Sequence, residues 1–213
     1  INYPLFDDNE VTSFKHFLLR TSGQDQYMTK IRDAFIHKAV KDVIDVDVLD
    51  SRPCVVYING EYWGLYNIRE KDNEDYLASH HGVDPKQLDI LVWNGYALEG
   101  SNEDYKALVK YVATHDMRKQ EYYEYVTSQI DVDNLIDYLI VQCYFGNTDS
   151  GNIKFWRDQN GGKWRWILYD MDWALFMKTY TWNNIYQIFN PNGMGSEDWI
   201  DTTLHVELMK NDQ

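Results

Sequence analysis

Residues 144–172 read YFGNTDSGNIKFWRDQNGGKWRWILYDMD, and this stretch decides the fold of the chain. A polar, glycine-containing loop leads into residues 152–157, and a DQNGG turn separates these from residues 163–169. Both segments alternate polar and apolar side chains, which predicts a hairpin with one buried face and one solvent-facing face. The loop before the hairpin and the acid after it therefore flank one supersecondary unit.

Four polar residues of this stretch are candidates for chemistry. Asp149 lies in the loop, where a fixed carboxylate could accept a hydroxyl proton. Asn152 begins the hairpin, and Asp170 and Asp172 follow its second strand, where oxygen ligands suit Mg²⁺ bound to phosphate. Phosphoryl transfer from ATP requires such groups, with one carboxylate beside the acceptor hydroxyl and two oxygen ligands for metal. The competing interpretation is that these residues are turn formers and caps that bond to nearby backbone.

An earlier hairpin is predicted upstream of this stretch. Asn59-Gly60 is a preferred turn dipeptide, and residues 54–58 and 62–68 on either side of it are rich in β-branched and aromatic side chains. The polar run that follows predicts a short helix ended by Gly82.

Helical spacing of apolar residues predicts further elements. An amphipathic helix is expected over residues 25–42, another over 102–114 and a long one over 133–145, with a strand at 88–93. The apolar stripe of the first helix consists of Met28, Ile31, Phe35 and Ala39, behind Asp25 as a candidate cap. The expected buried face of the long helix consists of Leu135, Ile136, Leu139, Ile140 and Cys143. Residues 190–195 are expected to form a loop, and residues 202–210 to begin a helix.

This order of elements predicts an α+β fold in a single domain over residues 1–213. A helix and hairpin in residues 1–68 precede a linker near residues 69–73, and a helical region with the second hairpin completes residues 69–213. The arrangement resembles the two-lobed plan of protein kinases. A single α+β domain without a cleft is the alternative that periodicity leaves open.

Composition and charge limit the partners. The 213 residues include 20 Lys and Arg against 34 Asp and Glu, a formal charge of −14, so the mean field repels nucleic acid and anionic lipid. A basic peptide is the better expectation, although acidic residues also keep a domain soluble. Cys54 and Cys143 lie in apolar runs and predict neither a disulfide nor a metal site. No apolar run is long enough for membrane insertion, and the chain reads as a piece of a longer protein with its N-terminal part truncated.

Four blocks of the chain together resemble the CotH family, the spore coat protein H-like atypical protein kinases. They are LRTSGQD with KIRDAF, then VYINGEYWGLYNIREKDNEDYL, then HGVDPKQLDIL, and finally FGNTD to WILYDMDWALF, in the family's order from about residue 14 onward. The resemblance implies a kinase-like fold and Mg²⁺- and ATP-dependent phosphorylation of serine in coat or extracellular proteins. It also implies an extracellular, cell-surface or spore-surface location.

The resemblance assigns roles to the acids of the opening stretch. Asp149 matches the family's catalytic-loop aspartate and Asn152 the metal-binding asparagine of that loop, with two residues between them where many members have four. Asp170 matches the acid equivalent to the DFG aspartate, and Asp172 an often acidic position that offers a second metal ligand.

Four further residues are implied to approach the nucleotide. Arg20 and Arg32 match family blocks and are candidates for phosphate contacts, against the alternative that they form structural ion pairs. Glu70 and Lys71 resemble the segment that joins the lobes near the adenine. A phosphate-binding lysine is expected outside this chain.

Three functions remain open from the sequence. The first is a Mg²⁺- and ATP-dependent protein kinase that acts on serine-rich, basic protein segments. The second is an inactive relative that serves as a surface binding or adhesion module, and the third is nucleotidyl transfer to protein on the same scaffold.

Overall fold

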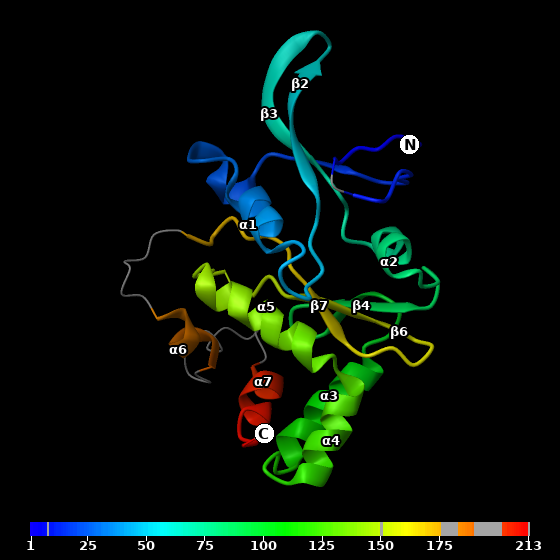
Figure 1. Ribbon diagram of the computed structural model, residues 1–213, viewed down its shortest axis with the longest axis vertical. Coiled ribbons are helices and arrows are strands. Elements are labelled where there is room, and N and C mark those ends of the chain that lie inside the picture. The colour runs from blue at the N-terminus through cyan, green and yellow to red at the C-terminus, as the bar shows by residue number, and fades with distance from the viewer. Residues whose placement is uncertain (8, 150, 176–182, 190–201, 213) are drawn as a thin grey trace.

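The computed structural model describes residues 1–7, 9–149, 151–175, 183–189 and 202–212, which form an α+β fold (Figure 1). The strands are β1 (Leu18–Arg20), β2 (Ser51–Ile58), β3 (Glu61–Arg69), β4 (Leu88–Val92), β5 (Tyr96–Glu99), β6 (Lys154–Asp158) and β7 (Arg165–Ile167). The helices are a 3₁₀ helix at Gly23–Tyr27 and α1 (Arg32–Val40), α2 (Glu74–His81), α3 (Glu103–Thr114), α4 (Gln120–Gln129), α5 (Val132–Tyr144), α6 (Asn184–Phe189) and α7 (Thr203–Leu208).

The lower sheet contains the predicted second hairpin. Its strands are antiparallel in the order β5-β4-β6-β7, and β6 pairs with β7 through Phe155 opposite Trp166. The prediction of one solvent-facing side is wrong, because Lys154, Phe155 and Trp156 are consecutive and all buried. Helices cover both faces of this sheet. The side chains that alternate along β6 and β7 therefore point into two different buried surfaces.

Two hydrophobic clusters sandwich the lower sheet. The larger one joins one face of the sheet to α3, α4, α5 and α7, and the largest fully buried side chain, Trp164, lies in it. The smaller one packs Leu77 of α2 against Ile90 and Trp156 on the other face. The lower sheet is thus a rigid platform for the loop and acids that flank its hairpin.

The upper sheet contains the predicted first hairpin, which the structure confirms. It is antiparallel in the order β1-β3-β2, and Asn59 and Gly60 take φ values of 52° and 86°, as their tight turn requires. β1 is short and pairs only with the end of β3, at residues 67–69. The rest of β2 and β3 projects from the body as a two-stranded arm (Figure 1).

The predicted helix over 25–42 is divided into the 3₁₀ helix and α1, and the chain between them passes through Lys30 with a φ of 63°. The expected apolar stripe is exposed. Met28, Ile31, Phe35 and Ala39 face outward, whereas Arg32, Asp33, Ile36, His37 and Val40 are buried. Ion pairs satisfy the buried polar groups, so this helix turns its polar side inward and hydrophobic spacing identifies the wrong face.

The long helix is confirmed as α5, but its buried face differs from the prediction. Leu135 is buried as expected, whereas Ile136 and Ile140 are 48% and 52% exposed. Asn134 takes an inner position instead, because its amide donates to the Asp45 carbonyl and its Oδ1 accepts the Trp166 N–H at 2.6 Å. The structure also contains α4, which the sequence patterns did not predict.

The remaining predicted elements agree with the structure where it describes them. Helix α2 begins at the Asn73 cap and ends at Gly82, α3 matches the helix over 102–114, β4 matches the strand at 88–93, and α7 lies in the segment 202–210. The predicted loop at 190–195 lies outside the described residues. None of the helices in the described ranges is long and apolar enough to span a membrane.

Candidate functional site

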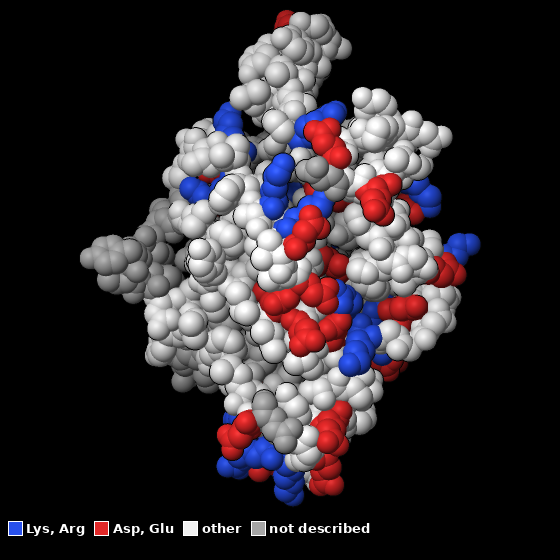
Figure 2. Space-filling view, viewed as in Figure 1, with Lys and Arg blue, Asp and Glu red and all other residues white. Residues whose placement is uncertain are grey.

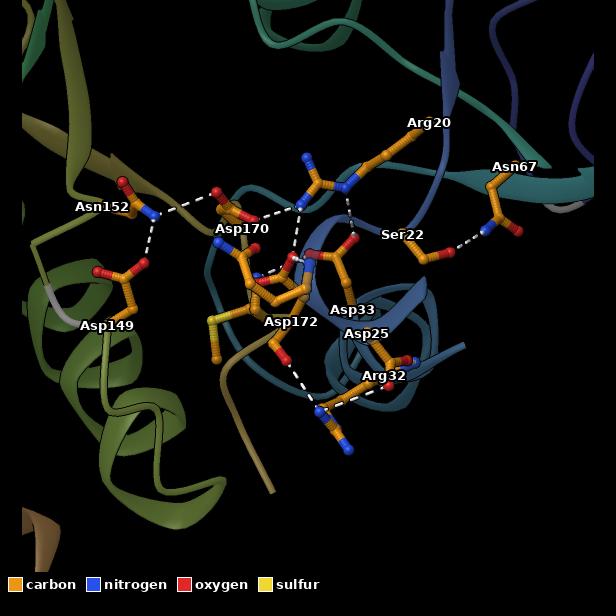
Figure 3. Close-up of polar contacts among 12 residues, drawn as sticks. Arg20, Ser22, Asp25, Arg32, Asp33, Asn67, Asp149, Asn152, Asp170 and Asp172 are labelled. Carbon is orange, nitrogen blue, oxygen red and sulfur yellow. Dashed lines mark hydrogen bonds and ion pairs between the residues drawn. The ribbon is translucent and has the colours of Figure 1, made fainter. Parts of the chain in front are cut away.

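Two acids of the opening stretch, Asp149 and Asp170, meet at the Asn152 amide. Asn152 precedes β6 and Asp170 follows β7, so the pairing of these strands brings the two residues together. The Asn152 Nδ2 donates to Asp149 at 2.9 Å and to Asp170 at 3.1 Å (Figure 3). The structure therefore places three of the predicted site residues in contact.

Asp170 has an unusual backbone conformation. Its φ is 54°, in the left-handed region that non-glycine residues seldom adopt. The N–H of the next residue, Met171, donates to Asp33 Oδ1 of α1 at 2.8 Å. The contact with α1 holds the turn that directs Asp170 toward Asn152, and Asp172 toward Arg20 and the chain after β1 (Figure 3).

Asp172 lies in a tight cradle made by the chain after β1. Its side chain is 1% exposed, and its Oδ2 accepts the Gln24 N–H at 2.8 Å. A Cβ on Gly23 would stand 1.9 Å from that oxygen, so only glycine permits this approach. The Arg32 guanidinium donates to the Asp172 carbonyl at 2.9 Å and so holds its backbone.

Arg20 joins the two acids. Its Nη2 is paired with Asp170 and lies 3.5 Å from Asp172 Oδ2, while its Nε lies 3.9 Å from Asp33 (Figure 3). Burial raises the pKa of the Asp172 carboxyl, and the charge of Asp170 adds to this, whereas the Gln24 N–H and Arg20 oppose it. Arg20 is thus the cation on which this acid pair depends.

A second buried ion pair lies behind the acids, and the sequence patterns did not reveal it. Asp33 of α1 is paired with Arg69 at the end of β3, and His37 lies one turn further along the helix. Burial, reinforced by the positive charge of Arg20, lowers the pKa of His37 to about 3. The signal for Asp33 and Arg69 was their presence in the family blocks KIRDAF and YNIRE, whereas His37 lies outside both blocks.

Arg32 and Asp25 also form a structural pair in this arrangement. Asp25 accepts the Arg32 N–H at 3.1 Å and the Thr29 hydroxyl at 2.6 Å, and its carboxylate lies 3.5 Å from the Arg32 guanidinium. Burial acts to raise the pKa of Asp25, but the hydrogen bonds from Thr29 and Arg32 lower it overall. Asp25 lies inside the 3₁₀ helix and accepts the first N–H of α1, but the N-cap position of α1 is Ile31, so the prediction of Asp25 as the helix cap is wrong. The phosphate contact of Arg32 stays a prediction.

Glu70 and Lys71 take part in different surroundings. Glu70 is buried and accepts hydrogen bonds from Asn9 at 2.9 Å, from His80 at 2.8 Å and from the Asp50 N–H at 2.9 Å. Together with the exposed Lys71 it lines a cavity of about 340 Å³ between the N-terminal segment and α2. None of the hydrogen bonds or ion pairs described here joins either residue to the acids, and their contact with adenine stays a prediction.

Lys154 is a further residue that the sequence patterns did not single out. It is buried on β6, and its Nζ donates to the Asp72 carboxylate at 2.7 Å and lies 5.2 Å from the centre of the Tyr169 ring. Asp72 belongs to the linker between β3 and α2. Lys154 thus fastens that linker to the strand that follows Asn152.

The residues present fit a divalent cation of the magnesium type. The Asp172 Oδ1 is buried and has no hydrogen-bond partner in the described part of the chain, so one ligand atom remains unsatisfied in this arrangement. Asp170 brings carboxylate oxygens of the kind that Mg²⁺ prefers to the same place, whereas Asn152 turns its amide nitrogen toward Asp149 and Asp170, and its role as a metal ligand stays a prediction. No cluster of three or more His, Cys, Asp or Glu side chains spaced for a metal occurs in the described ranges.

Comparison with known proteins identifies the family. The family model described as CotH kinase protein matches residues 2–213, almost the whole chain. No curated protein matches the chain. The α+β fold agrees with a kinase-like domain, and such a family implies ATP, a divalent metal and a protein substrate in general terms. The chain therefore belongs to the CotH kinase protein family.

Proposed function

We propose that this chain is a Mg²⁺- and ATP-dependent protein kinase that phosphorylates serine. The observation that carries the proposal is the contact of one amide, Asn152, with both Asp149 and Asp170. A kinase site needs an acid that orients the acceptor hydroxyl next to an acid and an amide that bind metal. Two residues between Asp149 and Asn152 are enough for this contact.

The order of elements before the linker supports the same proposal. In protein kinases a strand carries the phosphate-binding lysine, and the next helix carries the acid that pairs with it. Arg20 ends β1, and Asp33 of the following helix α1 lies 3.9 Å from its Nε. We therefore assign the phosphate-binding role to Arg20, within the chain, in place of the lysine that the resemblance suggested outside it.

The residues of the site have separate tasks in this mechanism. Asp149 accepts the hydrogen bond of the serine hydroxyl and orients its oxygen toward the γ-phosphorus, and Asn152 fixes the Asp149 carboxylate. Asp170, Asp172 and Asn152 would hold the metal, which supplies positive charge to the phosphate oxygens when bound. Arg20 offers a fork of donors to the same oxygens.

The substrate and location extend the proposal beyond the site. The formal charge of −14 favours basic, serine-rich protein segments, because the mean field of the protein attracts cations. A location outside the cell or on a cell or spore surface is proposed from the family resemblance alone.

Two alternatives remain distinct from this proposal. A surface binding module that lacks activity would use the same fold, and the pairing of Arg20 with both acids is the observation that favours it, since Arg20 already provides a cation to Asp170 and Asp172. Nucleotidyl transfer to protein would use the same metal ligands, but the nucleotide would bind in the opposite orientation, with its α-phosphate next to the protein hydroxyl.

Mass spectrometry of reaction products tests the proposal. The chain is incubated with Mg²⁺, ATP and serine-containing basic peptides, and a phosphate adduct on serine is expected, whereas a nucleotide adduct would replace the proposal by nucleotidyl transfer. Asp149→Asn should reduce the rate at least 100-fold and leave nucleotide affinity within about threefold. If the unchanged protein leaves the peptides unmodified, the result would support the surface binding module instead.

A further inference from the structure

The Arg20 guanidinium occupies the space between the two acids that the proposed function assigns to metal. One nitrogen, Nη2, is paired with Asp170 and reaches Asp172 Oδ2 at 3.5 Å. Arg20 has 26% of its side chain exposed and Asp172 only 1%, so the contact lies at the inner end of the site. A cation that bridges both carboxylates would take the place of this nitrogen.

The arrangement leaves two buried polar atoms without hydrogen bonds. These are Arg20 Nε and Asp172 Oδ1, which have no hydrogen-bond partner in the described part of the chain. A buried donor or acceptor without a partner costs about 1–3 kcal/mol. Unsatisfied Nε atoms also occur in the ion pairs of Arg69 and Arg165 in the described part of the chain, so the Arg20 Nε alone indicates little. The Asp172 Oδ1 is the unsatisfied carboxylate oxygen in that part of the chain, and it indicates that the site accommodates a second arrangement.

Charge explains why the two arrangements exclude each other. Asp172 is buried, and an isolated buried carboxylate is unstable unless a cation accompanies it. Arg20 provides that cation in the arrangement described here. A divalent cation at the same carboxylates would stand within a few ångströms of the guanidinium, and like charges in a partly buried site repel strongly.

Arg20 has other acceptors available when it leaves the acids. Asp33 lies 3.9 Å from its Nε, on the side of α1, and is itself fixed by its ion pair with Arg69. A phosphate group brought by a nucleotide would accept from the freed Nη2, since arginine binds phosphate through paired donors. A nucleotide would therefore give Arg20 a phosphate partner in place of the carboxylates.

We propose that Arg20 is a built-in counter-ion that competes with divalent metal for Asp170 and Asp172, so that metal binds tightly only together with the nucleotide. This inference rests on the proposed function for the identity of the metal site. It adds an order of binding, in which metal alone binds weakly because it must displace Arg20. The nucleotide removes that obstacle by giving Arg20 a new partner.

Titration with Mn²⁺ in the absence of nucleotide tests the inference, with free Mn²⁺ measured by electron paramagnetic resonance. Arg20→Gln removes the competing charge and should bind Mn²⁺ at least tenfold more tightly than the unchanged protein. Arg118→Gln is the matched control, because it removes the same charge from an exposed pair with Asp116 and should leave the affinity unchanged within twofold. Equal or weaker Mn²⁺ binding by Arg20→Gln would overturn the inference.

Circular dichroism establishes whether Arg20→Gln folds. If it does not, Arg20→Lys is used, since a lysine amine keeps the charge but has a single nitrogen in place of the guanidinium fork. It should bind Mn²⁺ about threefold more tightly than the unchanged protein, and equal binding would overturn the inference. The peptide assay separates the two proposals: phosphate transfer without tighter Mn²⁺ binding in the variants contradicts only the inference, whereas tighter binding without transfer contradicts only the proposed function.

Discussion

Gly23 allows the closest backbone approach in the site, and its replacement gives the sharpest prediction at the scale of the residue. Its φ is 52°, and a Cβ at this position would stand 1.9 Å from Asp172 Oδ2. Any other residue there would therefore be destabilised both by the left-handed backbone and by the collision with the carboxylate. Gly23→Ala should lower the free energy of unfolding by about 2–4 kcal/mol, more than the ~1–2 kcal/mol of left-handed backbone alone. Urea denaturation measures the change.

Gly82→Ala supplies the control for that prediction. Gly82 also has a positive φ, 69°, but a Cβ there would meet no atom within 4 Å. Its replacement should therefore show the backbone cost without the collision. Equal losses for the two variants would mean that the Asp172 cradle does not require glycine.

His37 gives a prediction about pH. Its Nδ1 accepts the Leu49 N–H at 3.0 Å, so a second proton on the ring would displace that bond, and its pKa falls from 6.5 to about 3 on folding. Because the folded state binds fewer protons between these values, the free energy of unfolding should decrease as pH falls from 6.5 toward 3, by up to about 1.4 kcal/mol per pH unit.

Replacing the titrating ring separates its contribution from those of the acids. His37→Gln keeps a polar group at the position but cannot gain a proton in this range. Urea unfolding at pH 7 and pH 4.5 should give a smaller difference for the variant than for the unchanged protein. The same difference in both proteins would show that other groups cause the acid sensitivity.

The contact among Asp149, Asn152 and Asp170 could be anticipated from the sequence because these residues lie in a recognisable loop and at a strand end, while their roles stay predictions. Asp33 and Arg69 could not, because their importance comes from a pairing between a helix and a strand 36 positions apart, which no local pattern encodes. Gly23 likewise depends on Asp172, far along the chain.

At the scale of the element, α5 shows what hydrophobic spacing misses. Leu135 packs in the core, whereas Ile136, predicted to be buried, is about half exposed. Leu135→Ala should lower the free energy of unfolding by about 2–4 kcal/mol and Ile136→Ala by less than about 1 kcal/mol. Similar losses for both variants, measured by urea denaturation, would mean that Ile136 is buried in solution as the sequence predicted.

The β2–β3 arm yields a second prediction at this scale. Residues 54–66 carry a single charged side chain, Glu61, and Val55, Tyr57, Tyr62 and Leu65 are more than half exposed. A two-stranded ribbon with open edges is only marginally stable. Its amides should exchange with deuterium at least tenfold faster than those of β4, as mass spectrometry of peptides would show. Equal protection would mean that the arm is covered in solution.

Turn chemistry and strand composition were sufficient to predict the two hairpins, because Asn59-Gly60 and the DQNGG turn act locally. The faces of β6 and α1 were not predictable in the same way. Both bury charged residues that find partners elsewhere in the chain, Lys154 with Asp72 and Asp33 with Arg69. Sequence periodicity depends on hydrophobicity alone, so it cannot predict which buried charged residues will find ion-pair partners.

At the scale of the whole molecule, charge leads to a prediction about substrates. Figure 2 shows acidic and basic groups mixed over the visible face, but the total formal charge is −14. If basic segments are the substrates, their KM should rise several-fold between 50 and 300 mM salt, since salt screens long-range attraction. An uncharged serine peptide is the control and should show little change. Equal salt dependence for both peptides would remove charge as a basis of selection.

Asp170 and its neighbours are proposed to bind nucleotide through a divalent metal, and the whole proposed function depends on this. Calorimetry of ATP binding tests it most directly, with Mg²⁺ or with a chelator, on the unchanged protein and on Asp170→Asn, which keeps the side-chain shape but removes the charge. We expect binding with Mg²⁺ that is lost with the chelator and weakened at least tenfold in Asp170→Asn. Binding that is the same with and without Mg²⁺, or no binding to the unchanged protein, would contradict the account.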